Sequence, residues 1–152
     1  MKYWLMKSEP TTYSIDDFAR DKKTLWECVR NYQARNFMKN EMSVDDQFLF
    51  YHSSCDVPAA MGIGIISSGA VADPSALDKK SEYFEPKATK EKPIWECVEV
   101  QFVKKFGKEV PLSDIRAQPK LRKMALLKPG TRLSIQPVTK EEFKLICKLG
   151  GE

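Results

Sequence analysis

Hydrophobic positions recur along the chain at two periods, which predicts strands and short helices in succession. Period-two alternation and aromatic content predict strands, and capping residues followed by apolar residues three and four positions apart predict helices. Two helix starts stand out: Ser14 with Asp17 resembles a capping box, and Thr139 with Glu142 is a complete one. The predicted strands span residues 3–6, 47–52, 61–66, 98–103 and 132–136, and the predicted short helices begin near residues 14, 33, 74, 113, 119 and 139.

Several residues refine this pattern. Gly62 and Gly64 lie inside a predicted strand, which indicates bends or a close approach of another backbone. Ser113 is expected to cap a short helix, and Pro137 to end the last strand. The strands and helices do not alternate regularly, as a doubly wound parallel sheet would require. We therefore expect one mixed α+β domain over residues 1–152, built around a curved, barrel-like sheet.

Length and composition support a single globular domain. The chain has 152 residues, of which 42% are hydrophobic and 30% charged. These proportions exclude a disordered tail, a collagen-like repeat and a coiled-coil rod. The formal net charge of +4 permits a polyanionic partner without demanding one, so the distribution of charge matters more than its sum.

The cysteines and the N-terminal segment argue against a metal-binding, exported or membrane-spanning protein. The four cysteines are widely spaced and the chain has one histidine, so we expect reduced, packed thiols and no metal site or cofactor. The N-terminal apolar run is too short for a signal peptide or a membrane span. We expect a cytoplasmic protein with no membrane partner, or a nuclear one if the source is eukaryotic.

Signals for an enzyme are weak. No Gly-x-Ser-x-Gly elbow or glycine-rich phosphate loop is present, and His52 is the only histidine available as a base. Carboxylates from distant parts of the chain could still meet, because sequence spacing does not determine their separation. An enzyme acting on a nucleotide or modified base, with His52 or Glu27 as the acid–base group, stays open as an alternative.

The segment from Trp26 to Phe37 is more informative. It places aromatic rings, arginines and side-chain amides around a predicted turn into a helix. Rings can stack on a flat heterocycle while amides read its edge, and Arg30, Arg35 and Lys39 could hold flanking phosphates. The alternative is structural: Trp26 and Phe37 would anchor the core and Asn31 would cap a helix.

Residues of two predicted strands could have either a structural role or a role in binding a ligand. His52 ends a strand, where a structural role is common. Ser134 and Gln136 share a strand face, and they either line a pocket or tie down a neighbouring loop.

Four blocks of sequence resemble a known family. They are residues 3–10 (Tyr-Trp-Leu-Met-Lys-Ser-Glu-Pro), 29–36 (Val-Arg-Asn-Tyr-Gln-Ala-Arg-Asn), 50–53 (Phe-Tyr-His-Ser) and 132–138 (Arg-Leu-Ser-Ile-Gln-Pro-Val). In this order they resemble the signature blocks of the EVE domain family. The resemblance implies a PUA-like fold, a small and strongly bent β-barrel with helices over its openings, related to YTH and ASCH domains. It also implies that the protein reads a modified base in DNA or RNA.

The resemblance also implies the site residues. Trp26 and Tyr32 are expected to stack on the base, and Ser8, Asn31 and Gln136 to read its edge. The full predicted base pocket is Ser8, Trp26, Asn31, Tyr32, Asn36, Tyr51, His52 and Gln136, and the predicted phosphate contacts are Lys7, Arg30, Arg35 and Lys39.

Two positions depart from the family pattern. Cys28 stands where relatives commonly have glycine, and Asp45-Asp46 replaces a Gly-Asp turn. The backbone is therefore expected to differ locally near the pocket rim and at that turn.

Together these features predict a module that binds nucleic acid without catalysis. A protein-interaction domain with a vestigial pocket is the remaining alternative.

Overall fold

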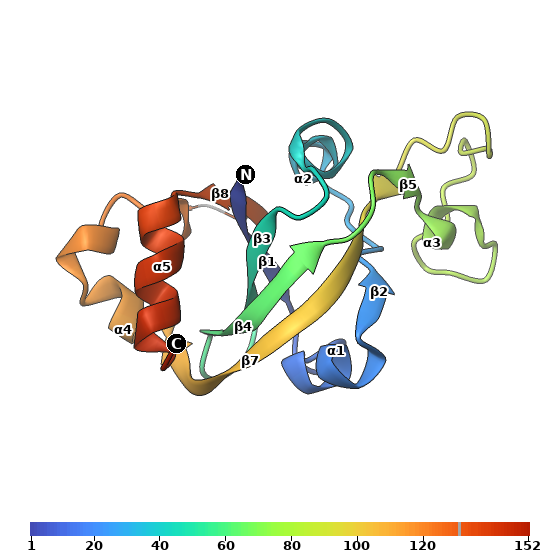
Figure 1. Cartoon of the computed structure of the whole chain (residues 1–152). Coiled ribbons are helices and arrows are strands. Elements are labelled where there is room, and N and C mark those ends of the chain that lie inside the picture. The colour runs from blue at the N-terminus through green and yellow to red at the C-terminus, as the bar shows by residue number, and fades with distance from the viewer. Residues whose placement is uncertain (131) are drawn as a thin grey trace.

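The computed structural model describes residues 1–130 and 132–152. Its main feature is a six-stranded mixed sheet that is curled strongly into a half-barrel with short helices around it (Figure 1). The order of strands across the sheet is β2-β7-β4-β3-β1-β8. The strands are β1 (Tyr3–Ser8), β2 (Lys23–Leu25), β3 (Gln47–His52), β4 (Ala59–Ile66), β7 (Glu99–Pro111) and β8 (Ile135–Val138), and β5 (Val71–Ala72) with β6 (Glu96–Cys97) forms a separate pair. The α-helices are α1 (Ile15–Asp21), α2 (Tyr32–Asn36), α3 (Pro74–Leu77), α4 (Leu112–Arg116) and α5 (Lys140–Leu149), with a π-helical turn η1 (Phe37–Glu41) and 3-10 turns η2 (Pro119–Leu121) and η3 (Ala125–Leu127).

Strand β1 lies between two neighbours and carries residues to both faces of the sheet. It runs parallel to β3 and antiparallel to β8. Trp4 is opposite Phe48, and Leu5 is opposite Leu49. Because successive side chains point to opposite faces, each pair belongs to a different hydrophobic cluster.

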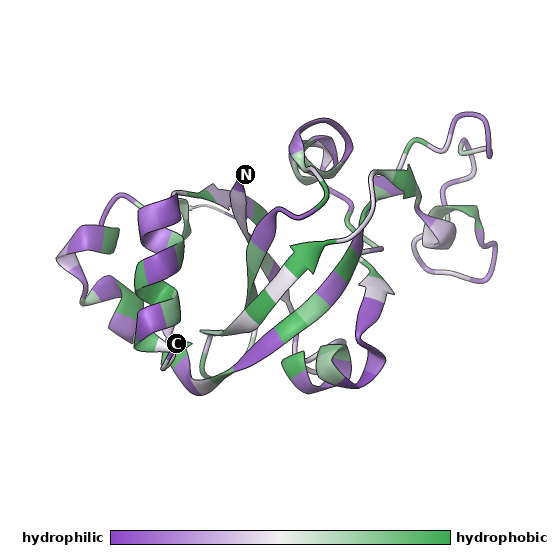
Figure 2. Ribbon diagram, viewed as in Figure 1, coloured by the Kyte–Doolittle hydropathy of each residue, from purple (hydrophilic) through white to green (hydrophobic). Residues whose placement is uncertain are grey.

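The two clusters explain why helices cover both faces. The cluster around Trp4 and Phe48 includes Phe18 of α1 and Ala34 of α2. The cluster around Leu5 includes residues of α4 and α5, which pack on the other side of the sheet (Figure 1). Figure 2 shows hydrophobic and polar residues interspersed along β7, as expected for a strand with differently solvated faces.

Both predicted capping boxes are confirmed. Ser14 and Asp17 exchange side-chain and backbone hydrogen bonds at the start of α1, and Thr139 and Glu142 do so at the start of α5. These interactions satisfy N–H groups that have no partner within the helix.

The predicted effect of the two strand glycines is also confirmed. A Cβ atom at Gly62 would clash with the carbonyl oxygen of Lys104, and one at Gly64 would clash with the ring of Phe48. The register of β4 and β7 shifts near both glycines, which is how this part of the sheet bends.

Some predicted boundaries were wrong in the middle of the chain. β7 extends to Pro111, well beyond residue 103, because exposed charged residues obscure the alternation in its second half. β2 was not predicted. The helix expected near residue 33 is confirmed as α2, which begins at Tyr32 and continues into η1. The expected helix from residue 119 is only the 3-10 turn η2.

Two predictions near the C-terminus were also wrong. Ser113 does not cap α4, because the chain passes from β7 directly into the helix and Leu112 donates its N–H to the carbonyl of Pro58. Pro137 does not end β8 but lies within it. β8 is an edge strand, where a residue without an N–H is tolerated.

Residues 73–95 form an arm that leaves the sheet at β5 and returns at β6, seen beyond α3 in Figure 1. The short helix predicted to begin near residue 74 is confirmed as α3. Among the described residues, none of the helices has the length and apolar character needed to span a membrane.

Candidate nucleic-acid interface

A hollow of about 470 Å³ opens beside the end of β1. We call it the Trp26 hollow. One wall is the end of β1 with the residues that follow it, and the other wall is the segment between β2 and α2. Its lining residues are Lys7, Ser8, Thr12, Tyr13, Thr24, Leu25, Trp26, Glu27, Cys28, Val29, Arg30 and Ser134.

Trp26 is the aromatic residue held most firmly in this hollow. Its ring meets Phe48 and Phe50 edge to face, with centroid distances of 5.9 and 5.6 Å, and its side chain is 7% exposed. Its backbone N–H donates to the carbonyl of Val98 at 2.9 Å. Trp26 therefore anchors the core, as the structural alternative expected, and it also lines the hollow; its stacking on a base stays a prediction.

Ser8 provides a polar group at the opposite wall. Its hydroxyl donates to the carbonyl of Tyr13 at 2.6 Å, so the position of Oγ is fixed. The lone pairs of that oxygen stay available to accept a hydrogen bond from a ligand.

Cys28 gives the rim an unusual backbone conformation. Its φ is 71°, in the left-handed region that favours glycine. This is the position where the family commonly has glycine, and Asp45, the second departure, has a φ of 77°. At both positions a residue with a side chain adopts the left-handed backbone conformation.

A buried carboxylate holds this rim in place. Asp73, 1% exposed, accepts hydrogen bonds from the backbone N–H of Cys28 and from Arg30 through Oδ2. Its Oδ1 accepts from the backbone N–H and the hydroxyl of Ser75. The rim and the base of the arm are therefore joined at a single side chain.

Glu27 is the acidic group of the hollow. Burial, and secondarily the charge of Asp73, raise the pKa of its carboxyl above the usual range. Burial likewise raises the pKa of the Cys28 thiol, so this cysteine is mainly a neutral, packed group.

Six of the eight predicted pocket residues lie outside the lining of the Trp26 hollow, and three of these six belong to α2 and its N-cap. Asn31 is the N-cap of α2, and its side chain accepts from the N–H of Ala34 at 2.9 Å. Tyr32 is 58% exposed and stacks on Trp95 at a centroid distance of 4.8 Å. Asn36 accepts two hydrogen bonds from Arg35.

His52 and Gln136 are engaged in local structure. Nε2 of His52 accepts the backbone N–H of Ile15 at 3.0 Å, where α1 begins. Burial lowers the pKa of this imidazole, which keeps Nε2 free to accept. Nε2 of Gln136 donates to the carbonyl of Leu133, while its buried Oε1 has no partner among the described residues.

Arg30 is occupied by protein groups. It contacts Asp73 at 3.1 Å, Ser75 at 3.0 Å and the carbonyl of Tyr83 at 2.8 Å. Its guanidinium also lies over the ring of Trp95, 5.1 Å from the centroid. A phosphate would have to compete with all of these contacts.

Arg35 and Lys39 are also paired within the chain. Arg35 donates to the carbonyl of Ile94 at 2.8 Å and lies over the ring of Tyr32. Lys39 forms an ion pair with Glu96 at 3.1 Å. Their expected contacts with phosphate stay predictions, and of the four predicted cations only Lys7 and Arg30 line the Trp26 hollow.

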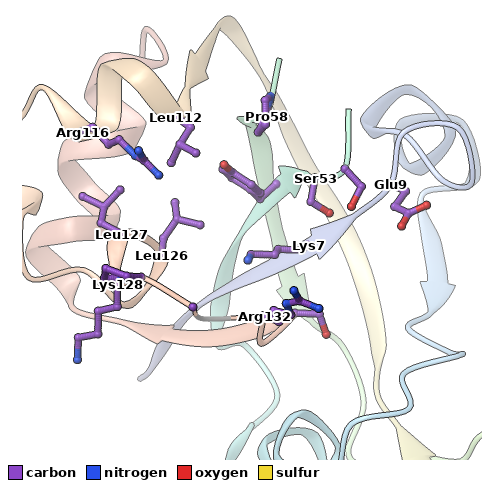
Figure 3. A pocket seen from close by; sticks show the side chains of 15 residues that line it. Lys7, Glu9, Ser53, Pro58, Leu112, Arg116, Leu126, Leu127, Lys128 and Arg132 are labelled. Atoms are coloured by element: carbon purple, nitrogen blue, oxygen red, sulfur yellow. The ribbon is translucent and has the colours of Figure 1, made fainter. Parts of the chain in front are cut away.

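A larger groove of about 1010 Å³ adjoins the hollow, and the two share Lys7 and Ser134. We call it the Arg116 groove (Figure 3). Its lining residues are Lys7, Glu9, Tyr51, Ser53, Ser54, Pro58, Leu112, Arg116, Leu126, Leu127, Lys128, Pro129, Gly130, Arg132 and Ser134. Tyr51, predicted for the base pocket, lies here, and burial raises the pKa of its hydroxyl to about 12.

The sequence did not indicate Arg116, Lys128 or Arg132 as part of a site. They come from the end of α4 and from the loop before β8, and Lys128 was read only as part of a turn. No local motif connects them, so only their common position beside β1 reveals the groove.

Metal chemistry has no obvious site here. The residues that the structure describes hold no group of three or more His, Cys, Asp or Glu side chains placed to bind a metal ion. The four cysteines are free thiols.

The model of the EVE domain family matches residues 2–149. The chain belongs to the EVE domain family. Chicken thymocyte nuclear protein 1 is 38% identical over 99% of this chain and 69% of its own length. The strongly curled half-barrel and its helices are consistent with the PUA-like fold expected for the family.

Solved structures of EVE relatives superpose closely on this chain. A protein of Pseudomonas syringae is 46% identical with a TM-score of 0.91, covering 97% of this chain and 99% of that one. Human THYN1, whose structure was solved in complex with DNA containing 5-methylcytosine, is 33% identical with a TM-score of 0.90. That comparison covers 100% of this chain and 99% of the human one.

Proposed function

We propose that this EVE domain binds DNA without catalysis and that the Trp26 hollow holds a modified base that is flipped or single-stranded. The observation that carries the proposal is an anchored aromatic ring in a hollow with polar walls, in a chain whose human relative was solved with 5-methylcytosine DNA. RNA with a modified base is the alternative ligand. The cytoplasmic or nuclear location stays a prediction.

The dimensions and chemistry of the hollow support a base as the occupant. Its volume of about 470 Å³ falls in the range of about 300–1,000 Å³ typical of small-molecule sites. The indole of Trp26 offers an apolar surface to a ring or a methyl group. Ser8 can accept from the base edge, because its hydroxyl already donates to Tyr13, and an ionised Glu27 can accept from the amino group of cytosine.

The proposal gives neither acid–base candidate a catalytic role: Glu27 lines the hollow and is assigned to binding the amino group of the base, and His52 is engaged by the protein. An acid–base group must have a free lone pair or proton within reach of the substrate. The imidazole of His52 already accepts from Ile15, and His52 lies outside the lining of the Trp26 hollow.

The test compares binding of cytosine and 5-methylcytosine in the same short DNA, single-stranded and duplex, by fluorescence anisotropy. Burying one methyl group contributes about 0.8 kcal/mol, so we expect methylated DNA to bind at least about fourfold more tightly. The same sequence as RNA, with and without 5-methylcytosine, measures the preference between DNA and RNA.

A substitution at the edge of the hollow tests its role. Thr12 is exposed and lines the hollow, whereas Thr11 is exposed and does not. Thr12→Trp should fill the hollow and abolish the preference for the methylated base, and Thr11→Trp should preserve it. Equal preference in both variants would exclude the hollow as the base site.

A further inference from the structure

The Arg116 groove carries four cations and a single carboxylate. Lys7, Arg116, Lys128 and Arg132 line it together with Glu9. Within the described part of the chain, none of these cations forms an ion pair with a carboxylate, in contrast to Arg30 and Lys39. The groove therefore presents positive charge that the protein does not itself neutralise.

Lys7 lies where the groove meets the Trp26 hollow. It is on β1, its backbone N–H donates to the carbonyl of Ser134 at 2.8 Å, and its side chain lines both cavities. Burial lowers the pKa of its ammonium group, because a half-buried charge loses hydration without gaining a partner. A bound anion would compensate for that loss.

The groove also has an apolar wall, which we call the leucine wall. Leu112, Leu126 and Leu127 lie on one side, and Figure 3 shows them facing the space into which Lys7 extends. Arg116 and Arg132 approach from different elements of the fold. An occupant should therefore combine negative charge with apolar surface, as the phosphates, sugars and bases of a nucleic-acid strand do.

We propose that the Arg116 groove binds the sugar–phosphate backbone of the DNA strand whose base occupies the Trp26 hollow, with phosphates between Lys7, Arg116 and Arg132. This inference rests on the proposed function, because it places in the groove the backbone of the DNA strand whose base occupies the Trp26 hollow. Lys7 contacts the phosphate next to the flipped base, and the leucine wall packs against the neighbouring nucleotide.

Of the phosphate contacts predicted from the sequence, this route keeps Lys7 but not the other three cations. Arg30, Arg35 and Lys39 would have to give up contacts with Asp73, Ile94 and Glu96 to bind phosphate. The groove cations need to break no such contact among the described residues. Because phosphate gains most from uncommitted cations, the strand follows the groove.

The test removes two groove charges and compares the result with removal of two charges nearby. Arg116→Gln with Arg132→Gln changes exposed residues of the groove. Lys120→Gln with Arg122→Gln removes the same charge from exposed positions outside it. The probes are 5-methyl-2′-deoxycytidine as a free nucleoside and a short single-stranded DNA with one 5-methylcytosine. Circular dichroism and thermal unfolding verify that each variant is folded.

We expect the groove variant to bind the oligonucleotide at least about tenfold more weakly than wild type, and the control variant within about twofold. The slope of log affinity against log salt should fall by about 1.4 in the groove variant, which corresponds to two lost phosphate contacts on a single strand. Binding of the nucleoside should be the same in all three proteins.

Different results identify which proposal fails. If the groove and control variants bind the oligonucleotide equally, the groove is not the path of the backbone, although methyl-dependent nucleoside binding would still support the Trp26 hollow. A third result is that the groove variant loses affinity for the oligonucleotide, while wild type binds methylated and unmethylated DNA equally and does not bind the nucleoside. In that case the groove assignment holds and the base site is overturned. If wild type binds neither probe, both proposals are overturned.

Discussion

The backbone N–H of Cys28 donates a hydrogen bond of 2.8 Å to Oδ2 of Asp73, a residue that is buried at the start of the arm. The same oxygen accepts from Arg30 at 3.1 Å. Two segments distant in sequence thus meet at one carboxylate, and the wall of the Trp26 hollow depends on it. The stability of the arm and the shape of the hollow are therefore linked.

Asp73→Ala should lower the free energy of unfolding by about 2–4 kcal/mol, because it leaves buried donors and a partly buried guanidinium without their partner. Urea denaturation measures this loss. Asp78→Ala is the matched control: Asp78 is exposed and accepts one bond from the backbone of Lys80, so its loss should stay below about 0.5 kcal/mol. Similar losses in both variants would contradict the role of Asp73.

Cys28→Gly should raise the free energy of unfolding by about 1 kcal/mol relative to Cys28→Ala. Both variants remove the thiol, but only glycine relieves the left-handed conformation at a φ of 71°. Chemical denaturation of the two proteins separates strain from the loss of sulfur contacts. Equal stabilities would mean that the backbone at this position carries no strain.

His52 should make the protein less stable as the pH falls. Burial holds its pKa below the usual value near 6.5, so the unfolded chain takes up the proton first. The stabilising effect of neutral His52 is present above about pH 6.5 and is lost as the pH falls toward the lowered pKa of the folded state. Asp16 and Glu109 oppose the lowering, and Lys105 adds to it.

Thermal unfolding between pH 7 and 5, in wild type and His52→Gln, measures this dependence. Wild type should lose more stability over this interval than the variant, which does not titrate there. His52 is the single histidine of the chain, so its imidazole signals in NMR report its pKa directly. A pKa at or above the usual value would contradict the burial of a neutral, accepting Nε2.

Tyr32→Leu should cost about 1 kcal/mol of stability, because Tyr32 stacks on Trp95 at 4.8 Å with an angle of 22° between the rings. Gln33→Leu, at an exposed position of the same helix, should be nearly neutral. Anisotropy with methylated DNA tests the role predicted for Tyr32 from the sequence. A large loss of affinity in Tyr32→Leu at unchanged stability would make Tyr32 a base contact and not part of the structural stack.

The structural roles considered for Trp26 and Asn31, core anchor and helix cap, are both observed in the fold. Asn31 caps α2, and Trp26 packs against Phe48 and Phe50. Trp26 nevertheless lines the hollow, so a residue of the core can also be part of a cavity wall. A sequence pattern could not decide this, because it does not show which part of a large ring stays accessible.

The sequence by itself determined the features that depend on neighbouring residues. The capping boxes at Ser14 and Thr139, the aromatic content of β3 and the four EVE sequence blocks are local, and a short stretch of chain is enough to specify each one. Boundaries were less certain where exposed charges interrupt the alternation, as in the second half of β7.

Only the tertiary structure decided which charges are free and which are already paired. Arg30 is paired with Asp73, whereas Lys7, Arg116 and Arg132 meet in a groove without a paired carboxylate among the described residues. The reason is physical: the pairing of β1 with β3 and β8, together with the curl of the sheet, brings distant segments together. Local propensity carries no information about such contacts, since the core and the strand register determine which side chains become neighbours.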